Sequence, residues 1–197
     1  MSNEWDEYAK EWDTKPDVIE YSEHAFKSLT DLIEIEGLNI LDFGCGTGLL
    51  SEKMSPKAKQ IVAIDSSIEM IEVLRNKNLP NVHVLSELLT EDLINSNDCL
   101  SRKFDLIVAS SVCGFLPNYN EILGLLKSLL VPNGVFVQWD WLVNDDHSEF
   151  GLSKNNIEKG FKHAQLKLES LSEPFTMGEG EESMSVIMAV GRNLSER

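Results

Sequence analysis

The sequence predicts an α/β protein, built as a mostly parallel sheet with helices on both faces. Short apolar runs alternate with helical patterns along the chain, which is typical of strand–helix–strand units. The run Phe104–Ser110 is almost wholly apolar, as expected for a strand buried on both faces. A length of 197 residues suits one domain. We therefore expect a single domain over 1–197, with an N-terminal segment and helix, 1–36, before a core, 37–197.

The first half of the chain alternates helical and strand-like segments. Apolar residues in 17–34 fall roughly on one helix face, and Gly37 ends that helix. In order, we then expect a strand over 39–43, a helix over 49–54, a strand over 60–64 that ends at Asp65, a helix capped by Ser66 or Ser67, and a short strand over 81–85. Within the capped helix, Ile68, Ile71 and Leu74 form an apolar stripe.

The second half continues the alternation and then changes character. In order, we expect a helix near 91–94, a strand over 104–110, a helix over 119–130, a strand over 135–140 after the turn VPNG, and a helix over 153–164. The segments 166–172 and 184–190 look like strands joined by a loop rich in Gly and Glu. The end of the chain therefore predicts a hairpin-like pair added to the parallel sheet.

Charge and composition exclude several classes of partner. The formal net charge is −16, and such a surface repels phosphate backbones, so we expect no nucleic-acid partner. No apolar stretch approaches the ~20 residues of a membrane helix, and the acidic N-terminus lacks the apolar core of a signal peptide. The three cysteines form neither a CxxC spacing nor a Cys/His cluster. We therefore expect a cytoplasmic protein with no metal site and no membrane association.

A glycine-rich segment follows the first predicted strand. The strand runs directly into Gly44-Cys45-Gly46-Thr47-Gly48, and a helix begins after it. Glycines permit tight turning and let a ligand lie against bare backbone. The helix N-terminus adds unpaired N–H groups and a partial positive charge, which suit an anion such as a carboxylate.

An acidic residue, Asp65, stands at the tip of the second predicted strand, where a carboxylate accepts hydrogen bonds from a ribose diol. Together with the glycines it predicts a cleft for an adenosine-bearing cofactor. The spacing is GxGxG, because Gly48 comes one place earlier than the third glycine of the dinucleotide pattern GxGxxG and Leu49 stands in that place. A nicotinamide cofactor is therefore disfavoured, and no GxxxxGK[ST] phosphate loop is found.

The segment ILDFGCGTG resembles motif I of the class I, Rossmann-like methyltransferases, which typically reads VLDxGCGTG. VAIDSS resembles the second motif of that family, FDLIVASSVCGFLP resembles its fourth strand with the loop that follows, and LLVPNGVFVQWD resembles its turn into strand five. EWDEYAKEWD is similar to the N-terminal lid of small-molecule members. The resemblance implies a three-layer α/β/α fold whose seven-stranded sheet has the order 3-2-1-4-5-7-6, with strand seven antiparallel.

The same resemblance implies S-adenosylmethionine as the cofactor, with transfer of its sulfonium methyl group to a nucleophilic atom. The small size, the acidic surface and the lack of an added domain favour a small-molecule acceptor. The loop after the fourth strand reads SSVCGFLP and lacks an Asn/Asp-Pro-Pro-Tyr motif, which disfavours exocyclic amino groups of adenine as targets. The acceptor, any catalytic base and the oligomeric state stay open.

Carried over residue by residue, the resemblance implies a cofactor site made of several short segments. The glycine loop would line the methionine part, the carboxylates would hold the amino group and the ribose, residues after strands two and three would flank the adenine, and aromatic residues would close the site. The residues concerned are Tyr8, Trp12, Asp42, Gly44, Cys45, Gly46, Asp65, Ser66, Met70, Glu87, Leu88, Ser110 and Ser111.

Plainer interpretations of the same residues stay open. Asp42 buttresses the loop in one of them, Ser66 is a helix cap, and Met70 belongs to the core. Trp5, Tyr8 and Trp12 are spaced so that packing onto the domain explains them as well as a lid does. Cys45 as a nucleophile and His147 as a base are weaker alternatives. For the whole protein, the alternatives are a cofactor-binding regulatory module without transferase activity and a nicotinamide-dependent oxidoreductase.

Overall fold

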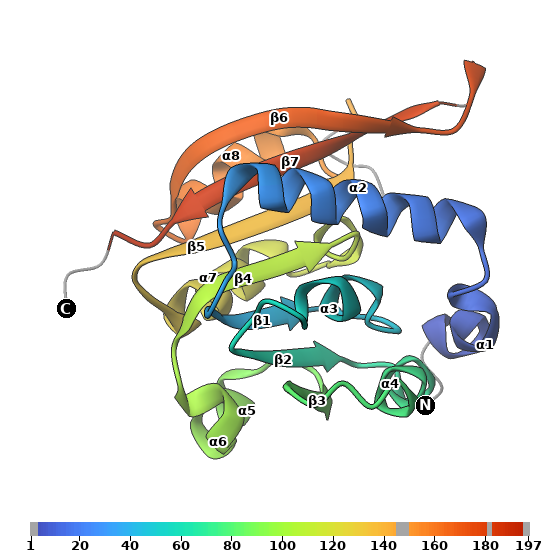
Figure 1. Ribbon diagram of the computed structural model, residues 1–197. Coiled ribbons are helices and arrows are strands. Elements are labelled where there is room, and N and C mark those ends of the chain that lie inside the picture. Colours follow the sequence, from blue (N-terminus) through green and yellow to red (C-terminus); the bar gives the residue numbers. More distant parts are fainter. Residues whose placement is uncertain (1–3, 145–149, 181–182, 195–197) are drawn as a thin grey trace. The chain divides into compact units, whose positions relative to one another are not determined.

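In the part of the chain that the computed structural model describes, residues 4–144, 150–180 and 183–194, seven strands form a sheet in the order β3-β2-β1-β4-β5-β7-β6 (Figure 1). The predicted order is therefore confirmed. β7 runs antiparallel to both β5 and β6, while the β1–β2, β2–β3 and β4–β5 ladders are parallel. The chain groups into two compact units, residues 1–102 and 103–197.

The elements agree closely with the sequence pattern. The first unit contains η1 (Glu4–Tyr8), α1 (Ala9–Trp12), α2 (Pro16–Leu32), β1 (Asn39–Phe43), α3 (Leu49–Met54), β2 (Gln60–Asp65), α4 (Ile68–Asn76), β3 (Val82–Ser86), α5 (Glu91–Ser96) and α6 (Asp98–Ser101). The second unit contains β4 (Phe104–Ser110), η2 (Cys113–Phe115), α7 (Tyr119–Leu129), β5 (Leu130–Trp141), α8 (Lys154–His163), β6 (Lys167–Met177) and β7 (Met184–Arg192).

The first unit owes its core to the apolar strands β1 and β2. Their side chains are buried over nearly their whole length, and α4 packs on β2 and β3 while α2 packs on α3. Of the apolar stripe on α4, Ile71 and Leu74 are buried, but Ile68 is 58% exposed. Ile68 is the first residue of the helix, directly after the loop that follows β2. The stripe therefore contributes to the core only from the second turn onward.

Side-chain caps determine where several helices begin. The Ser67 hydroxyl accepts a hydrogen bond from the Met70 N–H, so Ser67 and not Ser66 is the cap of α4. Thr90 caps α5 in the same way, and Ser153 caps α8. These polar residues satisfy N–H groups that the first helical turn leaves without an intrahelical partner.

The strand β5 begins earlier than the predicted 135–140. Its first residue, Leu130, pairs with Phe104, and the ladder then skips to Val135 opposite Leu106, so the predicted turn VPNG is a bulge inside the strand. The buried amide of Asn193 donates to the carbonyls of Leu130 and Val131 at 3.2 Å each. A partner 62 and 63 residues away in sequence thus stabilises the bulge, which no local pattern could indicate.

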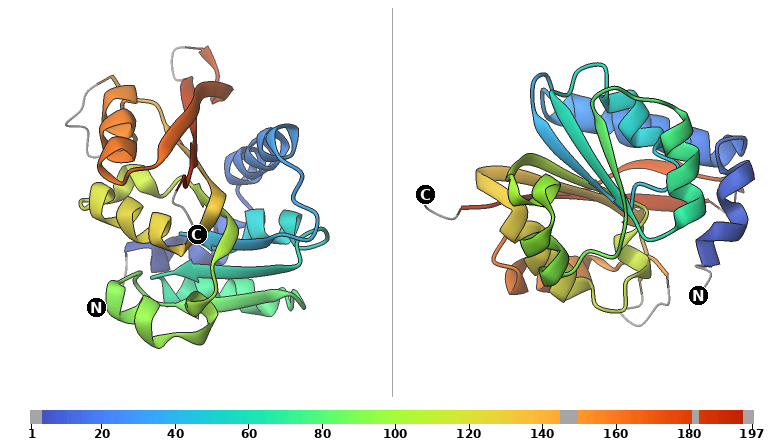
Figure 2. Two further views of the ribbon diagram at one scale, coloured as in Figure 1. Left: turned by 90° about the vertical axis from the view of Figure 1, so that its left-hand side faces the viewer. Right: turned by 90° about the horizontal axis from the view of Figure 1, so that it is seen from below.

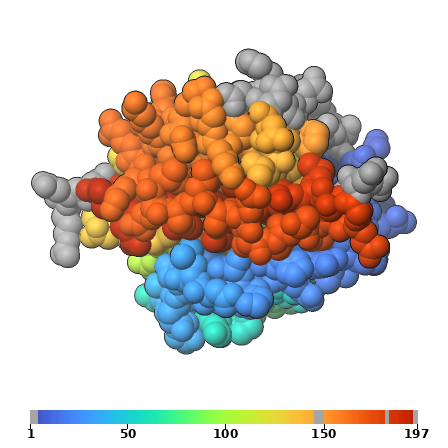
Figure 3. Space-filling view, turned by 90° about the horizontal axis from the view of Figure 1, so that it is seen from above, coloured from blue at the N-terminus to red at the C-terminus, as the bar shows by residue number. Residues whose placement is uncertain are grey.

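The strand β6 also differs from expectation, because it continues beyond residue 172 to Met177. The ladder to β7 shifts register twice, once near Glu169 and once across Glu173 and Pro174. β6 is one of the two edge strands of the sheet, and it lies beside α8 (Figures 2 and 3). Bulges, charges and a proline are devices that keep an exposed edge from pairing with another chain.

One close approach in the second unit gives a stability prediction. A Cβ on Gly191 of β7 would lie 2.6 Å from Phe161 Cε1, and the Phe161 ring packs on Phe136 with centroids 5.8 Å apart. We expect Gly191→Ala to lower the free energy of unfolding by about 1–3 kcal/mol, because the ring must leave its packed position.

The matched control is Gly124→Ala on α7, where an added Cβ meets nothing within 4 Å. There we expect a gain of about 0.5–1 kcal/mol from helix propensity. Urea denaturation of the two variants measures both effects, and equal stabilities would contradict the packing argument.

Candidate functional site

The loop between β1 and α3 is shaped by three glycines. Gly44, Gly46 and Gly48 have φ values of 66°, 53° and 78°, a region that other residues rarely adopt. The N–H groups of Gly44 and Cys45 both donate to the Ile64 carbonyl, at 2.8 and 3.1 Å, which ties the loop to β2. A Cβ on Gly46 would meet nothing within 4 Å, so bare backbone faces open space there. A Cβ on Gly48 would lie 2.3 Å from Leu74, so this glycine is required for packing on α4.

The carboxylate of Asp65 connects the loops that follow β1 and β2. Its Oδ2 accepts from the Gly46 N–H and its Oδ1 accepts from the Ser67 N–H, both at 2.9 Å. Burial raises the pKa of Asp65 above its ordinary value, while the backbone donors of Ser67 and Gly46 oppose the rise. Each carboxylate oxygen has a second lone-pair direction, so Asp65 can still accept hydrogen bonds from a ligand.

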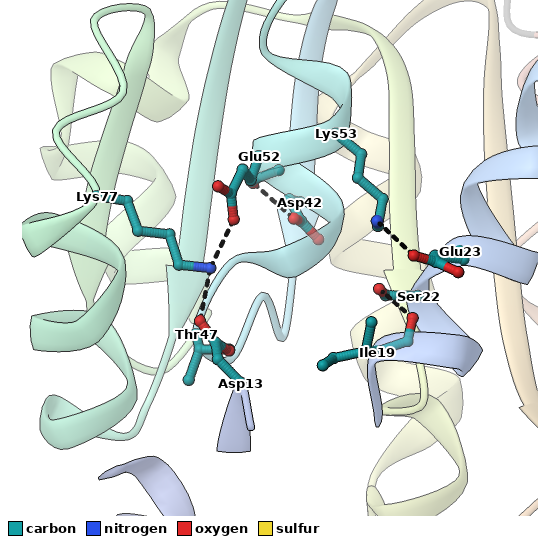
Figure 4. A network of polar contacts seen from close by, with 10 residues as sticks. Asp13, Ile19, Ser22, Glu23, Asp42, Thr47, Glu52, Lys53 and Lys77 are labelled. Atoms are coloured by element: carbon teal, nitrogen blue, oxygen red, sulfur yellow. Dashed lines mark hydrogen bonds and ion pairs between the residues drawn. The ribbon is translucent and has the colours of Figure 1, made fainter. Parts of the chain in front are cut away.

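Asp42, near the end of β1, contacts the helix that follows the glycine loop. Its carboxylate is buried and accepts from the Ser51 hydroxyl of α3 at 2.7 Å (Figure 4). Burial is the main cause that raises the pKa of Asp42 to about 6, with the charge of Asp65 adding to it. The structure therefore brings Asp42 into contact with the helix that follows the loop, which agrees with the buttressing interpretation.

Cys45, in the glycine loop, is within electrostatic range of both carboxylates. Burial, and then the negative charges of Asp42 and Asp65, raise the pKa of its thiol well above the ordinary value. A thiolate is the nucleophilic form of cysteine, and it is disfavoured here. The nucleophile alternative for Cys45 consequently lacks support, and the loop requires from this residue only a small side chain.

Two aspartates attach the N-terminal segment to the same loops. Asp13 accepts from the Thr47 hydroxyl at 2.5 Å, and its other carboxylate oxygen lies 2.7 Å from the Lys77 ammonium (Figure 4). Asp6 accepts from the Ser67 hydroxyl at 2.5 Å. Since η1 and α1 also pack against α4, the segment that carries Tyr8 and Trp12 is held at the glycine loop and at the loop after β2.

The predicted adenine-flanking residues differ in exposure. The Glu87 N–H donates to the Asp65 carbonyl at 3.0 Å, which places the end of β3 beside that of β2. Leu88 is 71% exposed, as an apolar contact for a flat base requires, and Ser66 is exposed too. Met70, by contrast, is buried in the core. The exposed Ile68 was not among the predicted site residues, because its place in an apolar stripe does not distinguish a core position from a surface one.

In the second unit, Ser110 is the last residue of β4, and Ser111 follows with a φ of 54°. The Ser111 N–H donates to the Trp139 carbonyl at 2.7 Å, so the neighbouring β5 fixes this turn. β5 runs to Trp141, one residue beyond the predicted end at 140, and Trp139 within it is fully buried. His147 lies outside the described residues.

A buried polar chain near the end of β5 escaped the sequence analysis. The Tyr119 hydroxyl donates to Gln138 Oε1 at 2.8 Å, and Gln138 Nε2 donates to Asp140 Oδ2 at 3.0 Å. Asp140 Oδ1 accepts from the Gly114 N–H at 2.7 Å. Burial raises the pKa of Asp140 to about 8, although both donors oppose the rise. Nothing in the local pattern QWDW shows that an aspartate there is only 1% exposed.

The same unit contains an open pocket of about 500 Å³ beside these hydrogen-bonded residues. Cys113, Gly114 and Tyr119 form part of its wall, and Asn118, Asn156 and Lys159 contribute polar groups.

Over the described residues, no three His, Cys, Asp or Glu side chains come together as metal ligands. Within those residues, no helix is long and apolar enough to span a bilayer.

Titration of Asp140 gives a pH prediction for stability. With a pKa of about 8 when folded and 3.8 ordinarily, the folded state keeps a proton that the unfolded state loses. Stability is therefore highest below pH 4 for this group and falls as pH rises to about 8. Between pH 5 and 8 we expect the wild type to lose about 3–4 kcal/mol more of its free energy of unfolding than Asp140→Asn does.

The control is Asp92→Asn, which makes the same change on the exposed face of α5. Urea denaturation at several pH values measures how the free energy of unfolding of each protein changes with pH. A wild-type slope matched by Asp140→Asn and by Asp92→Asn alike would mean that Asp140 ionises in the folded protein at its ordinary pKa.

Comparisons with known proteins agree with this arrangement. A family model described as a methyltransferase domain matches residues 18–171. An uncharacterized methyltransferase of Schizosaccharomyces pombe is 34% identical over 129 residues, which cover 62% of this chain and 45% of that protein. A ubiquinone biosynthesis O-methyltransferase of Haemophilus ducreyi is 28% identical over 102 residues, covering 50% and 43% respectively. The matches thus span less than half the length of these curated relatives.

Among solved structures, a SAM dependent methyltransferase from Aquifex aeolicus superimposes with a TM-score of 0.74 at 22% identity. The match covers 95% of this chain and 97% of that one. At this level of identity the likeness establishes the shared fold.

Proposed function

The chain belongs to the methyltransferase domain family, and on that premise we propose that it binds S-adenosylmethionine and transfers a methyl group to a small-molecule acceptor. The observation that carries the proposal is the Asp65 carboxylate, which joins the glycine loop to the loop after β2. An adenosine ribose beside Asp65 places the rest of the cofactor along the bare backbone of Gly46, where open space is available. The residues present therefore fit the cofactor.

Several residues of the first unit have distinct proposed roles. The backbone of Gly44, Cys45 and Gly46 lines the methionine part, and Asp42 fixes the start of α3 through Ser51. Ser66, Leu88 and the backbone of Glu87 flank the adenine, with Ile68 as an additional apolar contact. Met70 supports that surface from the core. Tyr8 and Trp12 close the site from the N-terminal segment.

The cofactor supplies an electrophilic methyl group on its sulfonium, and the protein supplies alignment and exclusion of water. Asp42 and Asp140 are buried and hold the segments that follow strands through Ser51 and Gly114. The half-buried Asp65 holds the glycine loop and keeps acceptor capacity for the ribose. We propose a small molecule as the acceptor because the chain combines a net charge of −16 with a compact family domain. Such a surface also opposes nucleic-acid binding, and we propose a cytoplasmic setting.

Calorimetry with S-adenosylmethionine, S-adenosylhomocysteine and NAD tests the proposal. We expect both sulfur compounds to bind and NAD not to bind. Binding of NAD alone would overturn the proposal in favour of an oxidoreductase. If both sulfur compounds bind but broad panels of acceptors show no methyl transfer, the regulatory module without transferase activity is the better description.

A substitution at the ribose-binding carboxylate gives a quantitative prediction. We expect Asp65→Ala to weaken S-adenosylmethionine binding by about 1–3 kcal/mol, the scale of leaving buried hydrogen-bonding groups unsatisfied. The control, Asp92→Ala, removes the same charge from the exposed face of α5 and should bind normally. Calorimetry on folded protein compares the two variants, and unchanged affinity in Asp65→Ala would remove this carboxylate from the site.

A further inference from the structure

Three aromatic rings of the N-terminal segment form a triangular cluster. The ring centroids of Trp5 and Tyr8 are 6.2 Å apart, those of Trp5 and Trp12 are 6.0 Å apart, and those of Tyr8 and Trp12 are 6.3 Å apart. The rings are inclined to one another by 55°, 84° and 59° in the same order, so they pack edge against face and not as a stack. Tyr8 is 48% exposed, which leaves the cluster open to solvent.

A positive charge already lies against this cluster. The Lys15 ammonium is 4.9 Å from the Tyr8 ring centroid and 5.1 Å from the Trp12 ring centroid. Both distances fall within the range in which a cation is attracted by the face of an aromatic ring. Lys15 is the residue before α2, so a flexible side chain from the next element brings the charge to the rings. The ammonium group of Lys15 therefore lies against two of the three rings.

The charges around the cluster favour a cationic ligand. Between Glu4 and Glu20 the sequence has seven carboxylates against two lysines. Asp6 and Asp13 hold the cluster at the loops after β2 and β1, while the side chains of Glu7 and Glu11 are exposed on the same segment. An anion would be repelled by this segment, and an apolar ligand would gain nothing from the position that Lys15 occupies.

We propose that Trp5, Tyr8 and Trp12 form a recognition site for a methylated onium cation, in which the Lys15 ammonium is a displaceable internal occupant. Aromatic cages that recognise quaternary ammonium groups use the same physical attraction. The cation has two possible sources, the sulfonium of the cofactor or an amine that is methylated. The proposal rests on the proposed function only for the source of the cation, because the rings and Lys15 are observed independently of it.

Choline and its neutral carbon isostere, 3,3-dimethyl-1-butanol, test the charge preference, with tryptophan fluorescence as the readout. We expect choline to bind the wild type about tenfold more tightly than the neutral isostere. Lys15→Met removes the internal occupant and should raise choline affinity severalfold. The matched control is Lys10→Met, which removes an exposed lysine of α1 that no ring contacts in the described structure, and it should leave choline affinity unchanged.

Two substitutions at the exposed ring separate recognition from folding. Tyr8→Leu should abolish the preference for choline over the isostere, whereas Tyr8→Phe keeps the ring and should retain the preference. The proposal is overturned if the wild type and Lys15→Met both bind choline no better than the isostere, or if Tyr8→Leu retains the full preference.

Binding of S-adenosylmethionine and neutral S-adenosylhomocysteine identifies the source of the cation. If the source is the cofactor, Tyr8→Leu lowers affinity for S-adenosylmethionine but not for S-adenosylhomocysteine, and choline competes with the former. If the source is an amine, choline binds alongside saturating S-adenosylhomocysteine. Normal S-adenosylhomocysteine binding without any choline preference would overturn this inference and leave the proposed function standing. Choline binding without binding of either sulfur compound would support this inference and overturn the proposed function.

Discussion

The arrangement of the first unit depends on a single carboxylate with two backbone partners. Asp65 ends β2 and accepts from the N–H groups of Gly46 and Ser67, each at 2.9 Å. Gly46 belongs to the loop after β1, and Ser67 is the N-cap residue of α4. A neutral side chain would attract these donors less strongly, because hydrogen bonds to charged acceptors are about twice as strong as neutral ones. The carboxylate therefore fixes the loop geometry before any ligand arrives.

The same design recurs at two other strand ends. Asp42 is the penultimate residue of β1 and Asp140 the penultimate residue of β5, and both are buried with a pKa above the ordinary range. Each accepts from a group of the segment that follows a strand: Ser51 for Asp42, and Gly114 for Asp140. Burying a carboxylate costs free energy, so each of these residues lowers stability in exchange for a defined position of the segment that it holds.

The N-terminal segment is attached to the loops after β1 and β2 through polar contacts as well as packing. Asp6 and Asp13 accept from Ser67 and Thr47, which are themselves a helix cap and part of the glycine loop. The aromatic residues between these two aspartates are consequently held at two points. Their stripe spacing alone is compatible with ordinary packing or with a lid, whereas the positions of the rings and of Lys15 give the stripe a chemical preference.

The sequence determined what depends on neighbouring residues. Alternating apolar runs, caps and glycines predicted β1, α3 and β4 to the residue, and the motif resemblance supplied the strand order. Only the tertiary structure decided what depends on distant partners: Asn193 turns the predicted VPNG turn into a bulge, Gln138 and Gly114 hold a buried Asp140, and Lys15 reaches two rings. Periodicity indicates which face of an element is apolar. Whether a carboxylate is buried, or a lysine contacts aromatic rings, depends on the three-dimensional positions of its partners.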